Sequence, residues 1–383
     1  MNNIRKKIAD ISSIGLTDAI GAATAAIFWF YIAAEIGPEN YGELTYLISI
    51  ASLVSGIALF GSHNTMLVLG GKKVDIQSTI YFLTIISNVI GSIIIFFMFY
   101  NIGISLVVIA YAMFSLVTFD LLGRRWYKDY SKYIILQKIL LVVFGIGLYY
   151  LIGENGILIG IALSHAHFLY HIIKSLKNSK INFSLIRERK EFFLNNFTLS
   201  ITGTFYGSID KIIIAPLLGF VILGNYSLGL QFFAILNLLP SLANKFFTSQ
   251  AVSGISNTKL KKIVILISIG VAALGSTIGP TVISYIFPKF VESEDIIRII
   301  SWVVVPMTIQ ASHYYPKLWT HEKNRYIVFS TVILVITQII GIFTLGPIYG
   351  GAGIALALLI SNIGSVMFTT IITKFVINVS DNN

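Results

Sequence analysis

Residues 326–373 read YIVFSTVILVITQIIGIFTLGPIYGGAGIALALLISNIGSVMFTTIIT and contain no Asp, Glu, Lys or Arg. A helix needs about 20 apolar residues to cross the hydrocarbon core of a bilayer, so this run is long enough for two crossings. Gly346 and Pro347 stand near its middle. Because glycine and proline favour turns, the sequence predicts two membrane-spanning helices joined by a hairpin at Gly346-Pro347.

Two further charge-free runs, residues 76–119 and 212–244, extend the same pattern. Only 11% of the residues are charged and 56% are hydrophobic, and the mean hydropathy is +0.83. A soluble domain carries about 25% charged residues, so this chain cannot cover itself with a wetted surface. The sequence therefore predicts an all-α integral membrane protein with about twelve spans. We place them at residues 11–36, 41–61, 78–100, 103–122, 133–152, 156–174, 197–218, 221–244, 263–287, 296–316, 326–346 and 350–373.

Lysine and arginine gather in alternate loops, and this sets the predicted orientation. Of the 27 basic residues, only Lys211, Lys289 and Arg298 fall off the side of the membrane on which these loops lie. Cytoplasmic loops carry the excess of Lys and Arg, so both termini are predicted to lie in the cytoplasm of a multi-pass protein of the plasma membrane. Short basic loops are not the contiguous basic face that binds nucleic acid. The basic loops contain Arg5, Lys72, Arg125, Lys190, Lys262, Arg325 and Lys374, and the intervening turns contain Glu39, Glu154 and Glu292.

The chain repeats part of itself. The tetrapeptide GIAL occurs at 160–163 and again at 353–356, an offset of 193, and at the same offset Trp126 matches Trp319. Spans 4–6 are therefore predicted to correspond to spans 10–12. Six spans separate the copies, so the two halves share one orientation, a parallel repeat of the kind common among transporters.

The repeat predicts two six-helix bundles, residues 1–177 and 196–383, related by a parallel pseudo-two-fold axis. The segment between them, residues 178–195, mixes apolar with basic residues. We interpret it as a cytoplasmic amphipathic helix lying on the inner leaflet. A solvated basic loop is the alternative.

No enzyme pattern is present. The chain lacks a phosphate-cradling glycine loop with its lysine, an HExxH pair and a GxSxG nucleophile elbow. It also lacks cysteine, which excludes disulfides and thiolate metal sites. His167 and His171 lie four apart on one helical face, but the further ligands of a metal site are missing. We interpret them as a polar, water-facing pair and predict neither metal nor cofactor.

Charged residues within the predicted spans are the informative group. Asp210 and Lys211 lie about 12 Å from the outer end of span 7. Charges at such depth face the bundle interior or a water-filled cavity. Neighbouring helical positions point about 100° apart, so the two side chains are not expected to aim at one spot. We predict that at least one faces a central cleft between the halves; a buried ion pair that only holds two helices together is the alternative.

Further cleft or substrate-site candidates are Asp18, Lys138, Lys245, His63 and Asn64. At an offset of 192 Asp18 matches Asp210, which weakly relates span 1 to span 7. Lys138 and Lys245 are also long enough to extend their ammonium groups to the inner interface. Polar side chains such as Asn64 can simply join neighbouring helices.

Two stretches resemble a known family. The run IGPENYGELTYLISI at 36–50 resembles the LGPExYG signature of the polysaccharide and oligosaccharide-lipid flippases, the Wzx-type proteins. The run DKIIIAPLLGFVILGNYSLG at 210–229 resembles their second signature, an Asp followed by a Gly and then a G-x-Y-S turn. The resemblance covers essentially the whole chain. Many relatives carry an arginine shortly before the first LGP, whereas this chain has Ala33-Ala34-Glu35, so any role of that arginine is not carried over.

The resemblance implies the superfamily that also holds multidrug and toxin extruders and the lipid II flippase. It implies a non-enzymatic transporter that moves lipid-linked oligosaccharide or polysaccharide repeat units to the outer leaflet by alternating access, for cell-envelope glycan synthesis. Lys211 would then meet the pyrophosphate as a point charge. The implied partners are a polyprenyl-linked glycan, the lipid bilayer and glycan-assembly enzymes.

Two other functions stay open. One is a cation-coupled multidrug or toxin extruder of the same fold, in which Asp18 and Asp210 would bind H⁺ or Na⁺. The other is a non-transporting membrane scaffold within a glycan-synthesis complex. Charges inside the membrane favour transport over a scaffold, and cationic residues favour the flippase over the drug extruder.

Overall fold

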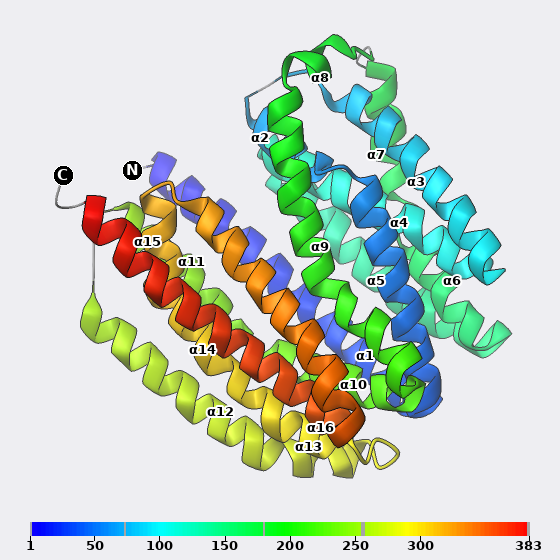
Figure 1. Cartoon of the computed structure of the whole chain (residues 1–383). Coiled ribbons are helices and arrows are strands. Elements are labelled where there is room, and N and C mark those ends of the chain that lie inside the picture. Colours follow the sequence, from blue (N-terminus) through cyan, green and yellow to red (C-terminus); the bar gives the residue numbers. More distant parts are fainter. Residues whose placement is uncertain (1, 73, 179–180, 254–256, 381–383) are drawn as a thin grey trace. The chain divides into compact units, whose positions relative to one another are not determined.

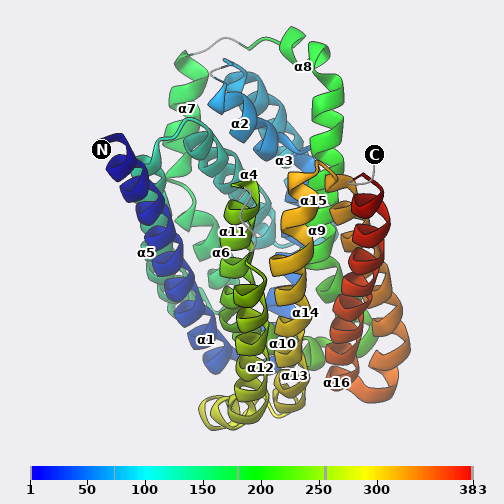
Figure 2. The same cartoon turned by 90° about the vertical axis from the view of Figure 1, so that its left-hand side faces the viewer.

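The computed structural model describes residues 2–72, 74–178, 181–253 and 257–380, and every regular element in these ranges is a helix (Figure 1). Helices are the expected outcome, because a segment that crosses lipid must satisfy its backbone hydrogen bonds internally. The α-helices are α1 (Asn2–Ala58), α2 (Ser62–Gly71), α3 (Gln77–Phe99), α4 (Ile102–Gly123), α5 (Tyr127–Ile152), α6 (Glu154–Ser164), α7 (Phe168–Asn178), α8 (Ser184–Glu188), α9 (Lys190–Leu218), α10 (Phe220–Leu236), α11 (Leu238–Val252), α12 (Thr258–Ile286), α13 (Ser293–Ile300), α14 (Val304–Ile309), α15 (Tyr315–Thr320) and α16 (Asn324–Ser380). A short 3-10 helix, η1 (Ser301–Val303), and a π-helical turn, η2 (Gln310–Tyr314), complete a bent course from α13 to α15 (Figure 2).

Nine helical segments of the described ranges are long and apolar enough to cross a membrane. Two of them, of 45 and 51 residues, measure about 68 and about 77 Å at 1.5 Å per residue, more than twice the thickness of a hydrocarbon core. Each contains a glycine with non-helical backbone angles, Gly37 in α1 and Gly350 in α16, and α16 visibly doubles back in both views (Figures 1 and 2). Counting each as two crossings and adding the 29-residue α9 gives the predicted number of about twelve.

The outward faces of the helices suit lipid. Ile93, Ile94 and Phe97 on α3 are 51%, 53% and 64% exposed. Apolar side chains presented in this way along a whole helix are stable only against an apolar solvent. The prediction of an all-α integral membrane protein is confirmed.

The chain folds into two compact units. Unit 1 consists of the chain up to Ile32 together with Leu47–Ser208, and unit 2 consists of Ala33–Tyr46 with the chain from Ile209 onward. The boundary between the units falls within α9, and the segment after span 1 belongs with unit 2. The division at residues 178–195 stays a prediction.

Each unit has its own apolar core. In unit 1 it is built around the fully buried side chains of Tyr81, Leu116 and Phe168, and in unit 2 around those of Ile214 and Tyr226. Within 178–195 the described residues form α8 and the start of α9, so this segment is not one continuous helix. Its apolar side chains Leu185, Ile186, Phe192 and Phe193 pack against the core of unit 1.

The internal repeat is present, but its register differs from the predicted one. The turn after α4 has Arg125 at φ 61°, and the turn after α15 has Glu322 at φ 58°, which corresponds to an offset of 197. The two turns share backbone hydrogen bonds at the same spacing. These are Trp126 N–H to Leu121 O and Lys323 N–H to Leu318 O, both 2.8 Å.

The following hairpins show the same offset. Gly153 (φ 73°) and Gly350 (φ 57°) occupy equivalent positions when the repeat is aligned in this register. Gly156 and Gly353 lie so close to the preceding helix that a Cβ on either would sit 2.1 Å from a backbone oxygen. The offset of 193 is therefore wrong by one helical turn, and the predicted break at Gly346-Pro347 falls at Gly350 instead. A shift of four residues rotates a helix by only about 40° beyond a full turn, so the pattern of apolar residues fits both offsets almost equally well.

Spans 1 and 7 show a second error of register. Each ends at a glycine with positive φ, Gly37 (φ 77°) and Gly219 (φ 90°), which gives an offset of 182. Asp18 therefore lies about five helical turns before its glycine, whereas Asp210 lies only about two and a half helical turns before its own. The two carboxylates are not equivalent, and the match at an offset of 192 is wrong.

The two segments that carry the family resemblance cross each other within unit 2. A Cβ on Gly42 would sit 1.9 Å from the backbone oxygen of Phe220, and a Cβ on Gly224 would sit 1.8 Å from that of Pro38. The hydroxyl groups of Thr45 and Ser227 are 3.0 Å apart beside this crossing. Only glycine permits such an approach, which gives the second glycine of each segment a structural reason.

Candidate functional site

Asp210 is buried on α9, where three groups donate to its carboxylate. The hydroxyl of Tyr226 on α10 donates to Oδ2 at 3.0 Å. The backbone N–H of Lys211 donates to Oδ1 at 2.8 Å, and the Lys211 ammonium lies 3.4 Å from the same oxygen. The side chains of Asp210 and Lys211 are 7% and 19% exposed.

The expectation that Asp210 and Lys211 cannot aim at one spot is wrong. The lysine stem is long and flexible enough to bend its ammonium back to the neighbouring carboxylate, which overrides the angle of about 100° between helical positions. In unit 2 the two residues therefore form one nearly neutral group. That one of them faces a central cleft stays a prediction.

Asp18 and Lys138 lie along the contact of α1 with α5 in unit 1. The Tyr130 hydroxyl donates to Asp18 Oδ1 at 2.8 Å, and Thr17 donates to Ser131 at 2.8 Å beside it. Half-buried Lys138 lies on the same face of α5, with its Cε 3.6 Å from the point where a Cβ on Gly21 would sit. Among the residues that the structure describes, no carboxylate lies within ion-pair distance of Lys138.

The remaining candidates are separate from these pairs. His63 on α2 packs edge-on against Phe119, with ring centroids 5.0 Å apart, and its buried Nδ1 has no hydrogen-bond partner within the described ranges. Its neighbour Asn64 is half-buried, and Lys245 is exposed on α11. The seven candidates thus form a unit 1 set and a unit 2 set. The unit 1 set is Asp18, His63, Asn64 and Lys138, and the unit 2 set is Asp210, Lys211 and Lys245.

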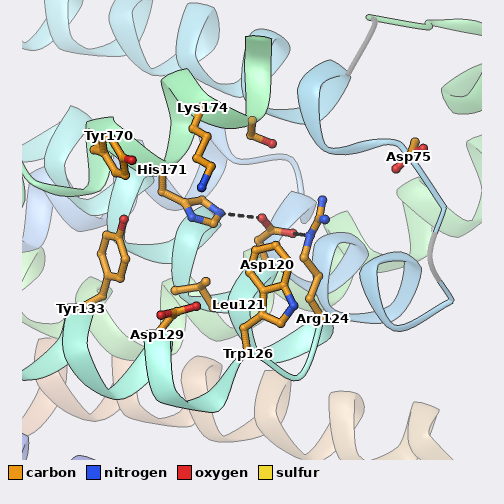
Figure 3. A pocket seen from close by; sticks show the side chains of 11 residues that line it. Asp75, Asp120, Leu121, Arg124, Trp126, Asp129, Tyr133, Tyr170, His171 and Lys174 are labelled. Carbon is orange, nitrogen blue, oxygen red and sulfur yellow. Dashed lines mark hydrogen bonds and ion pairs between the residues drawn. The ribbon is translucent and has the colours of Figure 1, made fainter. Parts of the chain in front are cut away.

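A further charged network in unit 1 was not predicted. Asp120, near the end of α4, is fully buried and holds Arg124 Nε at 2.8 Å and His171 Nε2 at 2.9 Å, as Figure 3 shows. The Tyr81 hydroxyl adds a third donor at 3.2 Å. A buried carboxylate needs such partners, because removing it from water is otherwise costly. The sequence does contain a signal, since Asp120 ends the charge-free run 76–119 and stands one helical turn before Arg124.

This network forms one wall of a polar cavity of about 460 Å³. Arg124 also lies over the ring of Trp126, 5.1 Å from its centroid. The guanidinium is thus paired with Asp120 and Trp126, and the imidazole is bonded to Asp120. The full lining is Asp75, Asp120, Leu121, Arg124, Trp126, Asp129, Tyr133, Tyr170, His171, Lys174 and Ser175 (Figure 3).

His167 and His171 do not form the predicted water-facing pair. The side chain of His171 is 12% exposed and is bonded to Asp120. The ring nitrogens of His167 lie 3.1 Å from the backbone oxygens of Ser164 and Tyr133. Both residues are half-buried, and both rings are hydrogen-bonded within the protein.

Comparisons with solved structures define the class of fold. An inward-closed conformation of the lipid II flippase MurJ matches with a TM-score of 0.67 at 16% identity, covering 94% of this chain and 87% of that one. An inward-facing multidrug resistance MATE family transporter of the MOP superfamily matches with a TM-score of 0.62 at 16% identity, covering 95% of each chain. A MATE structure in the bent conformation matches with a TM-score of 0.58 at 13% identity, covering 97% and 96%.

The chain therefore has the fold of MurJ and the MATE transporters, a multi-pass membrane transporter fold. At these identities the likeness extends to the fold alone. No protein-family model matches the sequence, and no curated protein matches it. The substrate has to be inferred from the charged groups themselves.

Proposed function

We propose that this protein is a flippase for an anionic lipid-linked oligosaccharide, with a headgroup that carries a pyrophosphate. The observation that carries the proposal is the balance of charges inside the membrane-spanning helices. The two buried carboxylates of the described residues, Asp120 and Asp210, are each paired with a cation, whereas half-buried Lys138 has no carboxylate within ion-pair distance in the described part of the chain. A cationic drug needs a free carboxylate, and a pyrophosphate needs a free cation.

Lys211 is suited to exchange its partner. Its ammonium is 3.4 Å from Asp210, which is long for an ion pair, and Tyr226 donates to the other carboxylate oxygen. Asp210 therefore keeps a good donor when Lys211 turns to an arriving anion. A membrane potential that is negative inside would favour export of the headgroup by about 2.3 kcal/mol per charge per 100 mV.

The experiment is a flipping assay in liposomes that contain a fluorescent oligosaccharide linked to polyprenyl pyrophosphate. Membrane-impermeant quencher added outside reports how fast the probe crosses. Lys138→Met keeps the length of the side chain but removes the charge, and we expect an initial rate about tenfold lower, the effect of one charge-assisted contact. Lys132→Met, on an exposed position of the same helix, is the matched control and should flip at the wild-type rate.

Two results would refute the proposal. One is a normal rate from Lys138→Met at normal protein content. The other is equal transport of a neutral glycolipid with the same prenyl tail, because a site built for pyrophosphate would not accept it equally well.

One observation favours the cation-coupled extruder as a second candidate. Asp18 accepts a hydrogen bond from the neutral Tyr130, and no cation lies within ion-pair distance of it in the described ranges. A carboxylate of this kind can bind H⁺ or Na⁺. If Asp18→Asn abolishes export of a cationic dye that the wild type expels, the extruder is supported. No dye export by the wild type under an imposed ion gradient would refute it.

A further inference from the structure

Three basic side chains meet at one end of unit 2, the end that the basic loops predict to be cytoplasmic. Lys261 stands in the first turns of α12, His313 in the π-helical turn η2 and Lys317 in α15. Lys261 is 9% exposed, and its ammonium lies 5.8 Å from the centroid of the buried Phe247 ring on α11. His313 is half-buried and Lys317 is exposed, so the group opens to solvent on one side.

These three groups lie near enough to one another for their charges to interact. Lys261 is close enough to Lys317 for the two charges to repel each other, and both lysines would also repel a positive charge on His313. Among the described residues no carboxylate lies within ion-pair distance of any of the three. A lysine that is nine-tenths buried is costly unless a partner neutralises it.

Unit 1 shows what such a partner does at the same place in the repeat. In the register fixed by the turns after α4 and α15, Lys317 occupies the position of Asp120. In unit 1 this position supplies an anion, which neutralises Arg124 and is hydrogen-bonded to His171. In unit 2 the same position supplies another cation, so among the described residues none takes the part that Asp120 plays in unit 1, and an anion bound from outside would supply the missing charge.

We infer that Lys261, His313 and Lys317 form a binding site for a phosphate or pyrophosphate group. Phosphate oxygens accept charge-assisted hydrogen bonds from several donors at once, which suits two ammonium groups and an imidazole. Lys261 also lies in the first turns of the 29-residue α12, where the helix dipole favours a negative charge. The group comes from a free anion or from the headgroup of a lipid in the adjoining leaflet. This site is independent of the proposed function, since a bound phosphate neither requires nor excludes flipping.

The test measures the Tm of the full-length protein in nanodiscs of zwitterionic lipid, with and without inorganic pyrophosphate. A ligand that binds only the folded state stabilises it by RT ln(1 + [L]/Kd), so the Tm rises with the ligand concentration. Lys261→Met and Lys317→Gln should each weaken the apparent affinity about tenfold or more, the effect of losing one charge-assisted partner. Lys262→Met is the matched control, because Lys262 is the exposed neighbour on the same helix. Sodium chloride at equal ionic strength controls for screening.

A second arm replaces part of the zwitterionic lipid by an anionic phospholipid. Stabilisation by pyrophosphate identifies a free anion, and stabilisation by the anionic lipid alone identifies a headgroup, provided that Lys261→Met and Lys317→Gln lose it and Lys262→Met keeps it. Lys317→Asp recreates the charge pattern of unit 1 and should raise the Tm without ligand while removing the response. No stabilisation in either arm, a response that persists in Lys261→Met and Lys317→Gln, or equal loss in Lys262→Met would overturn the inference.

Discussion

Replacing Gly42 by alanine tests how closely α1 and α10 approach each other in unit 2. The new Cβ would sit 1.9 Å from the backbone oxygen of Phe220 and 2.9 Å from the backbone nitrogen of Gly224. Overpacking that side chains can relieve costs about 1–3 kcal/mol. Here only backbone can move, and two helices would have to separate, so we expect a loss of about 3 kcal/mol or more.

The loss should be visible as a lower Tm in detergent and as lower abundance in the membrane. A change of about 3 kcal/mol corresponds to a drop in Tm of about 4 °C in a chain of this size. The matched control is Gly270→Ala on α12, because no atom lies within 4 Å of its added Cβ. Alanine is the better helix former, so this control should keep or slightly raise the Tm.

Gly224→Ala provides the reciprocal measurement, since its Cβ would sit 1.8 Å from the backbone oxygen of Pro38. The double variant should lose less than the sum of the single losses, because helices that have already separated accommodate the second methyl group. A wild-type Tm for Gly42→Ala, or full additivity in the double variant, would refute the close crossing.

Three further predictions follow from the charged groups and the topology. Lys211→Ala should abolish flipping at normal protein abundance, and Lys211→Arg should reduce flipping less because the charge is kept. Asp210→Asn should instead lower the abundance of the protein, because it leaves a buried lysine unpaired. Normal flipping by Lys211→Ala would contradict the role of Lys211. Asp120→Ala should cost about 3 kcal/mol because it removes the counter-ion of Arg124 and the hydrogen-bond partner of His171, and a Tm indistinguishable from wild type would contradict this. In this cysteine-free chain, impermeant maleimide added to intact cells should label Glu292→Cys and leave Lys190→Cys unlabelled; the reverse pattern would overturn the orientation.

The spans were predictable because the bilayer imposes a length and a polarity that hydropathy reads directly. The breaks at Gly37, Gly153 and Gly219 lie where turn-forming residues interrupt apolar runs. The break in the last run was misplaced from Gly350 to Gly346 because several turn formers stand together there. Only the backbone dihedral angles show at which of these residues the chain reverses direction, and the amino-acid composition of the segment does not reveal those angles.

The candidate site was less predictable, because it depends on which side chains meet. The sequence singled out Asp210 and Lys211 by depth, yet helical geometry alone missed that a flexible lysine stem reaches its neighbour. Asp120 was overlooked since it ends a charge-free run and its partner His171 comes from a helix 51 residues later. The inverted charge at Lys317 became visible only after the turns had fixed the true register of the repeat.

The tight hairpins also restrict what the protein exposes on its predicted external face. Gly153 and Gly219 are each the single residue between two consecutive helices, and Gly37 and Gly350 form kinks inside α1 and α16. Only Tyr100 and Asn101 join α3 to α4. Proteases, antibodies and inserted tags need a length of accessible chain, which such turns do not offer. Residues 287–292, between α12 and α13, are the longest connection on that face in the described part of the chain. An affinity tag or an extracellular binder for this protein is therefore best directed to that loop.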